Sequence, residues 1–439
     1  MPRTLLTVAA ACALAFSVSA PMTHASADTQ TNEGRFHKTA ATRLIDTRLS
    51  SGPVAKGGSL RVPVAGTSGV PAVGVKAAVV NITAIDTSAT GWITAYATGQ
   101  AKPWTSAVNF ERGWTGATTA TVPVGSDGSI TLSLGNASAN VAVDLIGYYS
   151  TAADTTELGS LALIADGFRL SDTRQTTGPV PGGATMVQTF RWDNPIAKPT
   201  SVAVNLTAVK PEAYGWLTAY SGATVPKTSS VNFTTGRTVA NYTIVPVTDL
   251  GGGTYGFSVH NGSAGATDVV VDLLAAYYDN PNGLGFVYNN VAPRRIIDTR
   301  VGIGAPKAPI GPDSVLVTAP PADLYGQFTL GFTGTITGVK PTANTYITQY
   351  SGMNADPGTS NLNLVAGQNQ SNGFGTTSRI DDQNKRYLSL YNQSGSVDVV
   401  EDVTGRFDAS PELIANWPNL PGLTQPAKGF SAPAPRIVR

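Results

Sequence analysis

The sequence predicts an all-β fold, with three tandem antiparallel β-sandwich domains of jelly-roll-like type following a signal peptide. Short β-branched or alternating segments separated by Gly, Pro, Asn and Asp are typical of strands joined by tight turns. A charged hexamer occurs three times at one interval, which indicates three copies of one structural unit. No stretch of twelve or more residues has the period of an amphipathic helix.

The N-terminus reads as an export signal. Arg3 provides a basic start, Leu5–Ala20 an apolar core, and Ala25–Ala27 a cleavage motif, so we expect cleavage near Ala27 and a secreted or cell-envelope-associated protein. The single cysteine, Cys12, lies within this leader. The mature chain then contains neither a cysteine nor a transmembrane segment, and its stability depends on core burial.

Composition excludes several classes of protein. Charged residues make up 13% of the 439 residues and the net charge is +1, whereas hydrophobic residues make up 41%. A nucleic-acid-binding protein needs a basic excess to neutralise phosphates, and this chain has none. Apolar content is high enough, and net charge low enough, for a packed core rather than disorder.

The hexamer R-x-x-D-T-R divides the chain. It begins at Arg43, Arg169 and Arg295, and both intervals, 43 to 169 and 169 to 295, are 126 residues. Linkers and strand-like runs follow it in the same order each time. We therefore predict a signal peptide (1–27), β-sandwich repeats at 28–151, 152–280 and 281–409, and a Pro-rich extended tail (410–439).

Copy one illustrates the element order. A segment around Arg43 precedes seven strand-like runs, and turn residues such as Gly57-Gly58 and Ser126-Asp127-Gly128 separate them. About eight short strands in this length fit a sandwich or a jelly roll, and periodicity does not distinguish the two topologies. The seven runs are Ser59–Val64, Ala77–Ala84, Gly91–Ala97, Ser106–Phe110, Ala117–Val124, Ser129–Leu134 and Asn140–Tyr149.

These motifs resemble a known module. The series R-[L/I]-x-D-T-R, V-N-[I/L]-T-A, G-W-[I/L]-T-A-Y, T-S-x-V-N-F and D-L-x-G-Y-Y is similar to a tandem repeat of secreted and cell-surface actinobacterial proteins. In that family the module occurs in tandem or beside exported enzymes such as cell-wall hydrolases. The resemblance implies an accessory or adhesive surface role, but no ligand-binding or catalytic residue.

The recurrent charges have two interpretations. Arg recognises carboxylates and hydroxyls through a planar fork, so each hexamer could clamp a ligand. We favour a structural polar network with a recurrent Asp near each closing strand, because each copy needs the same fold but not the same ligand. The predicted network consists of Arg43, Asp46, Arg48 and Asp144, then Arg169, Asp172, Arg174 and Asp272, then Arg295, Asp298, Arg300 and Asp402.

Aromatic residues are the candidates for binding. Trp92, Thr94 and Tyr96 share one face of a strand; we expect this recurrent strip to be core, the alternative being an exposed strip that stacks on sugars. The non-recurrent Trp104, Trp114 and Trp192 lie in loop-like contexts. Loop aromatics facing solvent would mark a ligand surface, so these three are our ligand-binding candidates.

Catalytic signals are few. The mature chain has two histidines, His37 and His260, in different copies, and no cysteine or G-x-S-x-G motif. We therefore expect no enzyme activity, no metal site and no cofactor. A carboxylate pair for glycoside hydrolysis has no sequence signature and stays open as an alternative.

Together these observations predict an exported, non-catalytic binding protein of the cell envelope that contacts cell-wall or extracellular glycans. The alternatives are a structural or assembly subunit that binds partner proteins, and a glycosidase. Copy three departs most from the pattern: we match its Leu330–Gly334 to Val80–Ala84 of copy one. If one copy is specialised, copy three and the tryptophans of copy one are the first places to look.

Overall fold

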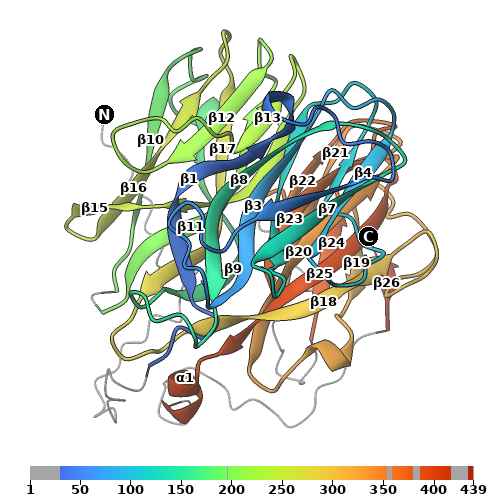
Figure 1. Cartoon of the computed structure of the whole chain (residues 1–439). Coiled ribbons are helices and arrows are strands. Elements are labelled where there is room, and N and C mark those ends of the chain that lie inside the picture. Colours follow the sequence, from blue (N-terminus) through green and yellow to red (C-terminus); the bar gives the residue numbers. More distant parts are fainter. Residues whose placement is uncertain (1–29, 195, 353–357, 379–385, 417–433, 439) are drawn as a thin grey trace.

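The computed structural model describes residues 30–194, 196–352, 358–378, 386–416 and 434–438, and Figure 1 shows their arrangement. The chain is mostly β, with several antiparallel sheets, as the sequence predicts. The predicted signal peptide lies outside the described residues. Within them, no helix is both long and apolar enough to cross a membrane.

The eight strands of copy one lie close to the predicted positions. The first, eighth, third and sixth form one sheet, in the order β1-β8-β3-β6, and the others form a second, β2-β7-β4-β5. Asp46 caps the short 3-10 turn Thr47–Leu49 that follows β1. The strands are β1 (Phe36–Asp46), β2 (Ser59–Pro63), β3 (Val75–Ile85), β4 (Gly91–Ala97), β5 (Val108–Phe110), β6 (Gly116–Pro123), β7 (Ser129–Gly135) and β8 (Asn140–Ser150).

Copy two repeats both strand orders. One sheet runs β14-β11-β17-β9 and the other β10-β16-β12-β13, with the short β15 added beside β16. A 3-10 turn, Thr173–Gln175, again follows the first strand. The strands are β9 (Leu161–Asp172), β10 (Thr185–Arg191), β11 (Lys198–Val209), β12 (Gly215–Tyr220), β13 (Val231–Phe233), β14 (Val239–Pro246), β15 (Thr248–Gly251), β16 (Thr254–Asn261) and β17 (Asp268–Asp279).

Copy three has the orders β18-β25-β20-β23 and β22-β21-β24-β19. Its first strand joins β9 through the pair Phe286 and Ala162, so copies two and three share one eight-stranded sheet. A 3-10 turn spans Ala322–Leu324. The strands are β18 (Phe286–Asp298), β19 (Ser314–Thr318), β20 (Thr329–Val339), β21 (Thr345–Tyr350), β22 (Leu362–Leu364), β23 (Gln370–Thr377), β24 (Leu388–Asn392) and β25 (Asp398–Ala409).

The C-terminal segment is not extended throughout. Its described residues form the short helix α1 (Pro411–Asn416) and the strand β26 (Arg436–Val438). This strand pairs antiparallel with β19 and so adds a fifth strand to the sheet β22-β21-β24-β19 of copy three. The Pro-rich composition concealed both elements.

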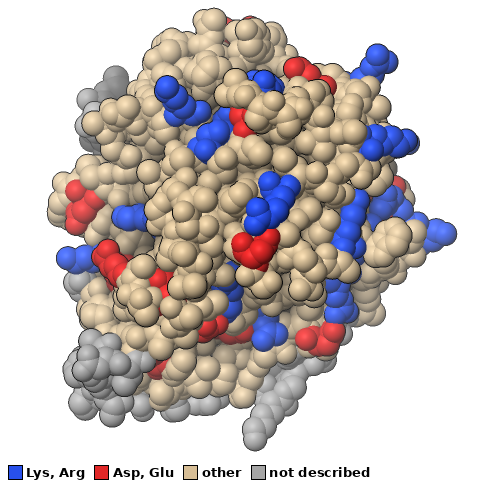
Figure 2. Space-filling model, in the orientation of Figure 1, with Lys and Arg blue, Asp and Glu red and all other residues tan. Residues whose placement is uncertain are grey.

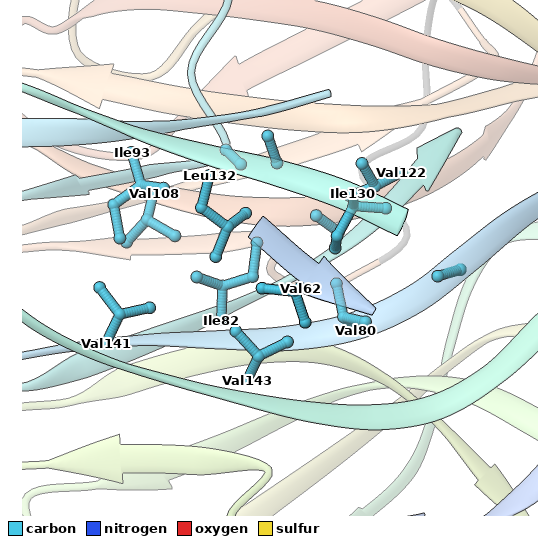
Figure 3. Close-up of a cluster of buried hydrophobic side chains, with 14 of the residues drawn as sticks. Val62, Val80, Ile82, Ile93, Val108, Val122, Ile130, Leu132, Val141 and Val143 are labelled. Carbon is cyan, nitrogen blue, oxygen red and sulfur yellow. The ribbon is translucent and has the colours of Figure 1, made fainter. Parts of the chain in front are cut away.

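Each copy buries a core between its two sheets. In copy one, Val80 and Ile82 of β3 face Ile130 and Leu132 of β7, as Figure 3 shows. All four side chains are fully buried. The inward positions on both sheets alternate with outward ones, which is the pattern from which the strands were predicted.

A further core lies where the three copies meet. Tyr149 of copy one donates or accepts a 2.6 Å hydrogen bond with the hydroxyl of Tyr277 of copy two. Its ring also stacks on Tyr288 of copy three, with centroids 4.2 Å apart, and contacts Phe407 edge-on at 6.1 Å. These residues belong to one buried cluster drawn from all three copies. The copies therefore share an interior in addition to their own cores.

The strand register corrects one match between copies. Asn81 lies opposite Asp144, and Asn205 lies opposite Asp272. In copy three, Thr335 occupies this place opposite Asp402. The counterpart of Val80–Ala84 is therefore Gly334–Gly338, four residues beyond the segment matched from sequence. The segment was mismatched because glycines and a threonine stand in Gly334–Gly338 where copy one has the valine, asparagine and alanine of Val80–Ala84.

Candidate functional site

The hexamer residues form one charged cluster in each copy. In copy one, Arg43 donates to both oxygens of Asp144 and, through Nη1, to Asp46 at 2.8 Å. Arg48 donates to Asp46 from its backbone N–H at 3.1 Å and its Nη2 at 2.6 Å. Thr47 accepts from the N–H of Val141 at 2.9 Å. The cluster thus ties the first strand and its turn to the closing strand.

Copies two and three repeat this geometry. Arg169 bonds Asp272 and Asp172, and Arg295 bonds Asp402 and Asp298. Arg174 and Arg300 each bind the aspartate two residues before them. All twelve residues predicted as a polar network are brought together in three sets of four. Every hexamer has its own recurrent aspartate as partner.

The two kinds of aspartate titrate differently. Hydrogen bonds from Arg48 and Arg174 lower the pKa of Asp46 and Asp172. Asp144 and Asp272 are 2% and 0% exposed, and desolvation raises the pKa of each despite its arginine partner. A carboxylate this deeply buried depends on its partner for charge compensation.

The same clusters also hydrogen-bond a residue of another copy. Asp402 accepts a 3.2 Å hydrogen bond from the N–H of Ser106 in copy one. Asp144 accepts a backbone hydrogen bond from Ser229, and Asp272 accepts one from Ser360; each bond partly opposes the rise in pKa that desolvation causes. Copy one therefore contacts copy two, copy two contacts copy three, and copy three returns to copy one. Sequence analysis assigned the clusters a role within a copy and missed this second role.

Buried asparagines add further hydrogen bonds at two of these boundaries, between copies one and two and between copies two and three. Asn81 donates to the carbonyl of Ser229 at 2.6 Å, and Asn241 donates to Asn81 at 2.9 Å. At the next boundary Asn205 donates to the carbonyl of Ser360, and Asn372 donates to Asn205 at 2.9 Å. Unpaired buried amides are costly, so these pairs fix how the copies dock.

The third boundary uses threonines where the others use asparagines. Thr335 stands at the place of Asn81, and Thr118 at the place of Asn241. Here Asn109 contributes instead: its N–H donates to Ser371 at 2.9 Å and its amide to Thr337 at 3.2 Å. Asn109 also donates to Ser106 at 2.9 Å, as Asn232 does to Ser229.

The three candidate tryptophans lie in different environments. Trp104 is 98% exposed, whereas Trp192 is 8% exposed and donates from its indole N–H to the carbonyl of Ala197. Trp114 is half-buried against the core of copy one and covers Gly116. Trp192 therefore does not face solvent, and we withdraw it as a ligand-binding candidate. Its neighbouring turn suggested a loop, but the side chain turns inward.

The recurrent aromatic strip is exposed at its tryptophans, whereas Thr94, Tyr220 and Tyr350 of the same strip are buried. Ile93 and Ala95 are the residues of β4 that face the interior, while Trp92 is 39% exposed on the outer face. Trp216 of copy two is 41% exposed. The expectation that Trp92 belongs to the core is wrong, because alternation identifies two faces but does not say which is buried.

Each of these exposed indoles lies across a glycine. A Cβ on Gly135 would meet the Trp92 ring at 2.1 Å, and one on Gly262 would meet Trp216 at 2.3 Å. The missing side chain lets the ring lie close to the sheet while the indole stays partly exposed. The same contact also protects the glycine backbone of the strand.

A pocket of about 170 Å³ opens at the boundary of copies one and two. Its lining includes Asp144 and Asn81 of copy one, and Tyr220 and Ser229 of copy two. Among the lining residues one carboxylate, Asp144, is present, whereas glycoside hydrolysis uses two. Within the described residues, no group of three or more His, Cys, Asp or Glu side chains lies close enough to hold a metal ion.

Comparison with known proteins adds little. No family model matches the chain, and no curated protein matches it. A solved structure described as the atomic structure of Sulfolobus turreted icosahedral virus has a TM-score of 0.19 and 11% identity, covering 86% of this chain and 92% of that one. Another, described as the triple jelly roll fold and turret assembly in an archaeal virus, has a TM-score of 0.16 and 12% identity, covering 86% and 91%. Likenesses this distant carry no argument about this chain.

Proposed function

We propose that the chain is a closed ring of three jelly-roll modules, with boundaries near 28–151, 152–280 and 281–409. The orders first-eighth-third-sixth and second-seventh-fourth-fifth, which recur in all three copies, are those of a jelly roll. The polar boundaries between copies support treating the ring as one rigid body. Such a body holds surface loops in fixed positions.

We further propose that the protein is exported, associates with the cell envelope, is non-catalytic, and contacts glycans. The exposed aromatics support this proposal best: Trp104 is almost fully exposed, and Trp92 and Trp216 are each partly exposed. An aromatic ring offers an apolar face with a partial negative charge, and such a face packs on the C–H face of a sugar. Preorganised rings bind with a smaller entropy cost than mobile ones.

The surface charge is compatible with a neutral ligand. Figure 2 shows one face on which charged side chains stand singly or in small groups on a mostly uncharged surface. The net charge of +1 provides little long-range attraction for polyanions. Recognition of a neutral glycan depends instead on stacking and short-range hydrogen bonds.

The test is co-sedimentation of the mature protein with purified cell-wall sacculi, followed by a glycan panel. We expect enrichment on walls, reduced in Trp104→Ala and further reduced in a Trp92→Ala, Trp216→Ala double variant. Leu49→Ala is the matched control, because Leu49 is 86% exposed but aliphatic. No enrichment of the unaltered protein over a non-binding control, on walls and on glycans, would remove the glycan proposal.

One observation favours the second candidate, an assembly subunit. Strand β26 covers the edge of β19, whereas the matching strands β2 and β10 have no partner beyond their outer edges within the described residues. Open edges accept strands from other chains. Size-exclusion chromatography with light scattering tests this: a strictly monomeric protein with no co-purifying partner counts against assembly.

A further inference from the structure

The second strand of each copy lies at the outer edge of its sheet, and the three edges differ. These strands are β2, β10 and β19, which are bonded on their inner sides to β7, β16 and β24. Register matches Arg61, Val187 and Val317, because the residue that each one faces also lies opposite a recurrent tyrosine, Tyr96, Tyr220 or Tyr350. The copies therefore allow one strand edge to be compared three times.

Copies one and three protect this edge in different ways. In copy three, β26 pairs with Val315 and Val317 and leaves Val317 buried. In copy one, Arg61 occupies the matched position and forms an exposed charge pair with Asp127, and Pro63 follows two residues later. A charged side chain discourages another strand from pairing, and a proline has no N–H to donate to it.

Copy two has neither form of protection. Its edge strand β10 has seven residues, against five in β2 and in β19, and no charged residue before Arg191. Val187 stands where copy one has Arg61, and Thr189 where it has Pro63. The side chain of Val187 is 66% exposed. Figure 1 shows β10 at the left margin of the molecule.

The backbone of β10 has open hydrogen-bonding groups along this edge. Ala184 and Trp192, which flank the strand, bond to the β16 hairpin on the inner side. Backbone groups alternate between the two sides of a strand, so Thr185, Val187 and Thr189 direct theirs outward. Among the residues that the structure describes, the outward groups of Thr185 and Val187 have no partner, while the carbonyl of Thr189 accepts from the side-chain amide before it at 2.8 Å. Such a row of open groups is a template for another strand.

A second copy of this chain supplies a complementary strand. Two β10 strands related by a two-fold axis at Val187 pair antiparallel, with Val187 opposite its symmetry mate and Thr185 opposite Thr189. The facing side chains are then uncharged and β-branched, and such cross-strand pairs stabilise antiparallel sheets. The net charge of +1 causes little repulsion between copies. Strand β26 does not compete for this edge, because it is paired with β19 of its own chain.

Contact through a single strand limits the affinity. Stable protein interfaces bury about 1,200–2,000 Å² in total, and one pair of seven-residue strands is expected to bury less. The resulting dimer should therefore form at high protein concentration and dissociate on dilution.

We propose that β10 is a homodimerisation edge, at which two copies of the chain join by antiparallel pairing of their β10 strands. The two sheets that contain β10 then form one continuous sheet. The inference rests on the assembly role given above as the second candidate function, for which it names the partner and the strand. It is independent of glycan binding.

The experiment is sedimentation velocity of the mature full chain over a concentration series. We expect the mass to rise toward twice that of the monomer, and Val187→Arg and Thr189→Pro each to raise the dissociation constant about tenfold or more. Copy one carries these two residues at the matched positions, so the fold accommodates them. Leu49→Arg, which adds the same charge at an exposed site outside β10, and Thr189→Ala, which keeps the N–H, are the controls and should dimerise like the unaltered protein.

Disulfide cross-linking gives a second readout, because the mature chain has no cysteine of its own. Directly opposed residues in an antiparallel pair have Cα atoms ~5.5 Å apart, within the ~4.4–6.8 Å that a disulfide spans. Val187→Cys should therefore form a covalent dimer faster than the control Leu49→Cys, which is also highly exposed.

The outcomes separate this inference from the candidate on which it rests. A dimer that Val187→Arg and Thr189→Pro leave unchanged, or equal cross-linking of the two cysteine variants, would overturn the β10 assignment while the assembly role stands. A chain that is monomeric at every concentration overturns the β10 assignment as well, and with no co-purifying partner it also counts against assembly. Wall binding is measured separately and does not depend on any of these results.

Discussion

The carboxylate of Asp402 accepts a hydrogen bond from the backbone N–H of Ser106 at 3.2 Å, although 296 residues separate them. Copies one and two, and copies two and three, are adjacent in sequence, but copies three and one are not. This contact therefore closes the ring without help from a linker. It also places the carboxylate between Arg295 of its own copy and the backbone of another.

Asp402→Ala is expected to destabilise the protein by about 1–3 kcal/mol, because it removes the acceptor for the partly buried N–H of Ser106 and leaves Arg295 with Asp298 as its carboxylate partner. Denaturant unfolding at neutral pH measures this loss. The matched control is Asp127→Ala, which breaks the solvent-exposed pair with Arg61 and should have a much smaller effect on stability. Equal effects of the two variants would contradict the assignment of Asp402 to the ring closure.

Gly373 is required by the packing of the shared interior. Its strand position matches Thr119 of copy one and Tyr242 of copy two, and a Cβ there would lie 2.2 Å from the carbonyl oxygen of Thr119. Gly373→Ala should cost about 1–3 kcal/mol through overpacking. Gly375→Ala is the control on the same strand, because its Cβ meets nothing closer than 3.6 Å. If both alanines unfold at the same denaturant concentration, the close approach at Gly373 is not a constraint.

Glu401 gives copy three a distinctive pH dependence. It is fully buried at the strand position that Val143 and Val271 occupy in the other copies, and desolvation raises its pKa from 4.5 to about 8, an effect that the neighbouring amide of Gln349 only partly opposes. Between these two pKa values the folded state keeps a proton that the unfolded chain has lost. Stability contributed at this position therefore falls as pH rises from about 4.5 to 8 and is constant above that.

Glu401→Gln cannot ionise and should escape this loss. The stability advantage of the variant should grow with pH across this window, by up to about 1.4 kcal/mol per pH unit, and level off above pH 8. Denaturant titrations of both proteins between pH 4 and 9 measure the difference. An advantage that does not change with pH would show that the carboxyl of Glu401 keeps an ordinary pKa in the folded state.

The strand positions and the charged clusters could be predicted from the sequence, because alternation marks strands and recurrence marks residues that act together. Strand positions in copy one agree with the structure to within a few residues at most ends, because inward and outward side chains alternate. Recurrence also indicated that Arg43 and Asp144 act together. It did not reveal the bond between Asn81 and Ser229, since recurrence does not distinguish a residue that docks one copy on another from a residue that folds a single copy.

Other features had a signal that was available but not decisive. Glu401 stands out once the copies are aligned by register, because a charged residue then replaces two valines of the core. Trp92 was misplaced because a strand pattern has two faces, and only the partner Gly135 on the neighbouring strand reveals that the ring lies outside. The pocket between copies one and two lies beside a local irregularity of β1, between Lys38 and Thr42, for which the sequence has no signature.

The strand β26 protects an edge. It pairs with β19 through the positions Val315 with Val438 and Val317 with Arg436, and so occupies backbone groups that would otherwise be open to another chain. A variant that ends at residue 433 should therefore self-associate more strongly than the full chain, with an apparent mass that rises with concentration. Light scattering after size-exclusion chromatography, at matched concentrations, measures this. If the truncated and full chains show the same mass at every concentration, β26 does not shield the edge, and its pairing is dispensable for keeping copies of the protein apart.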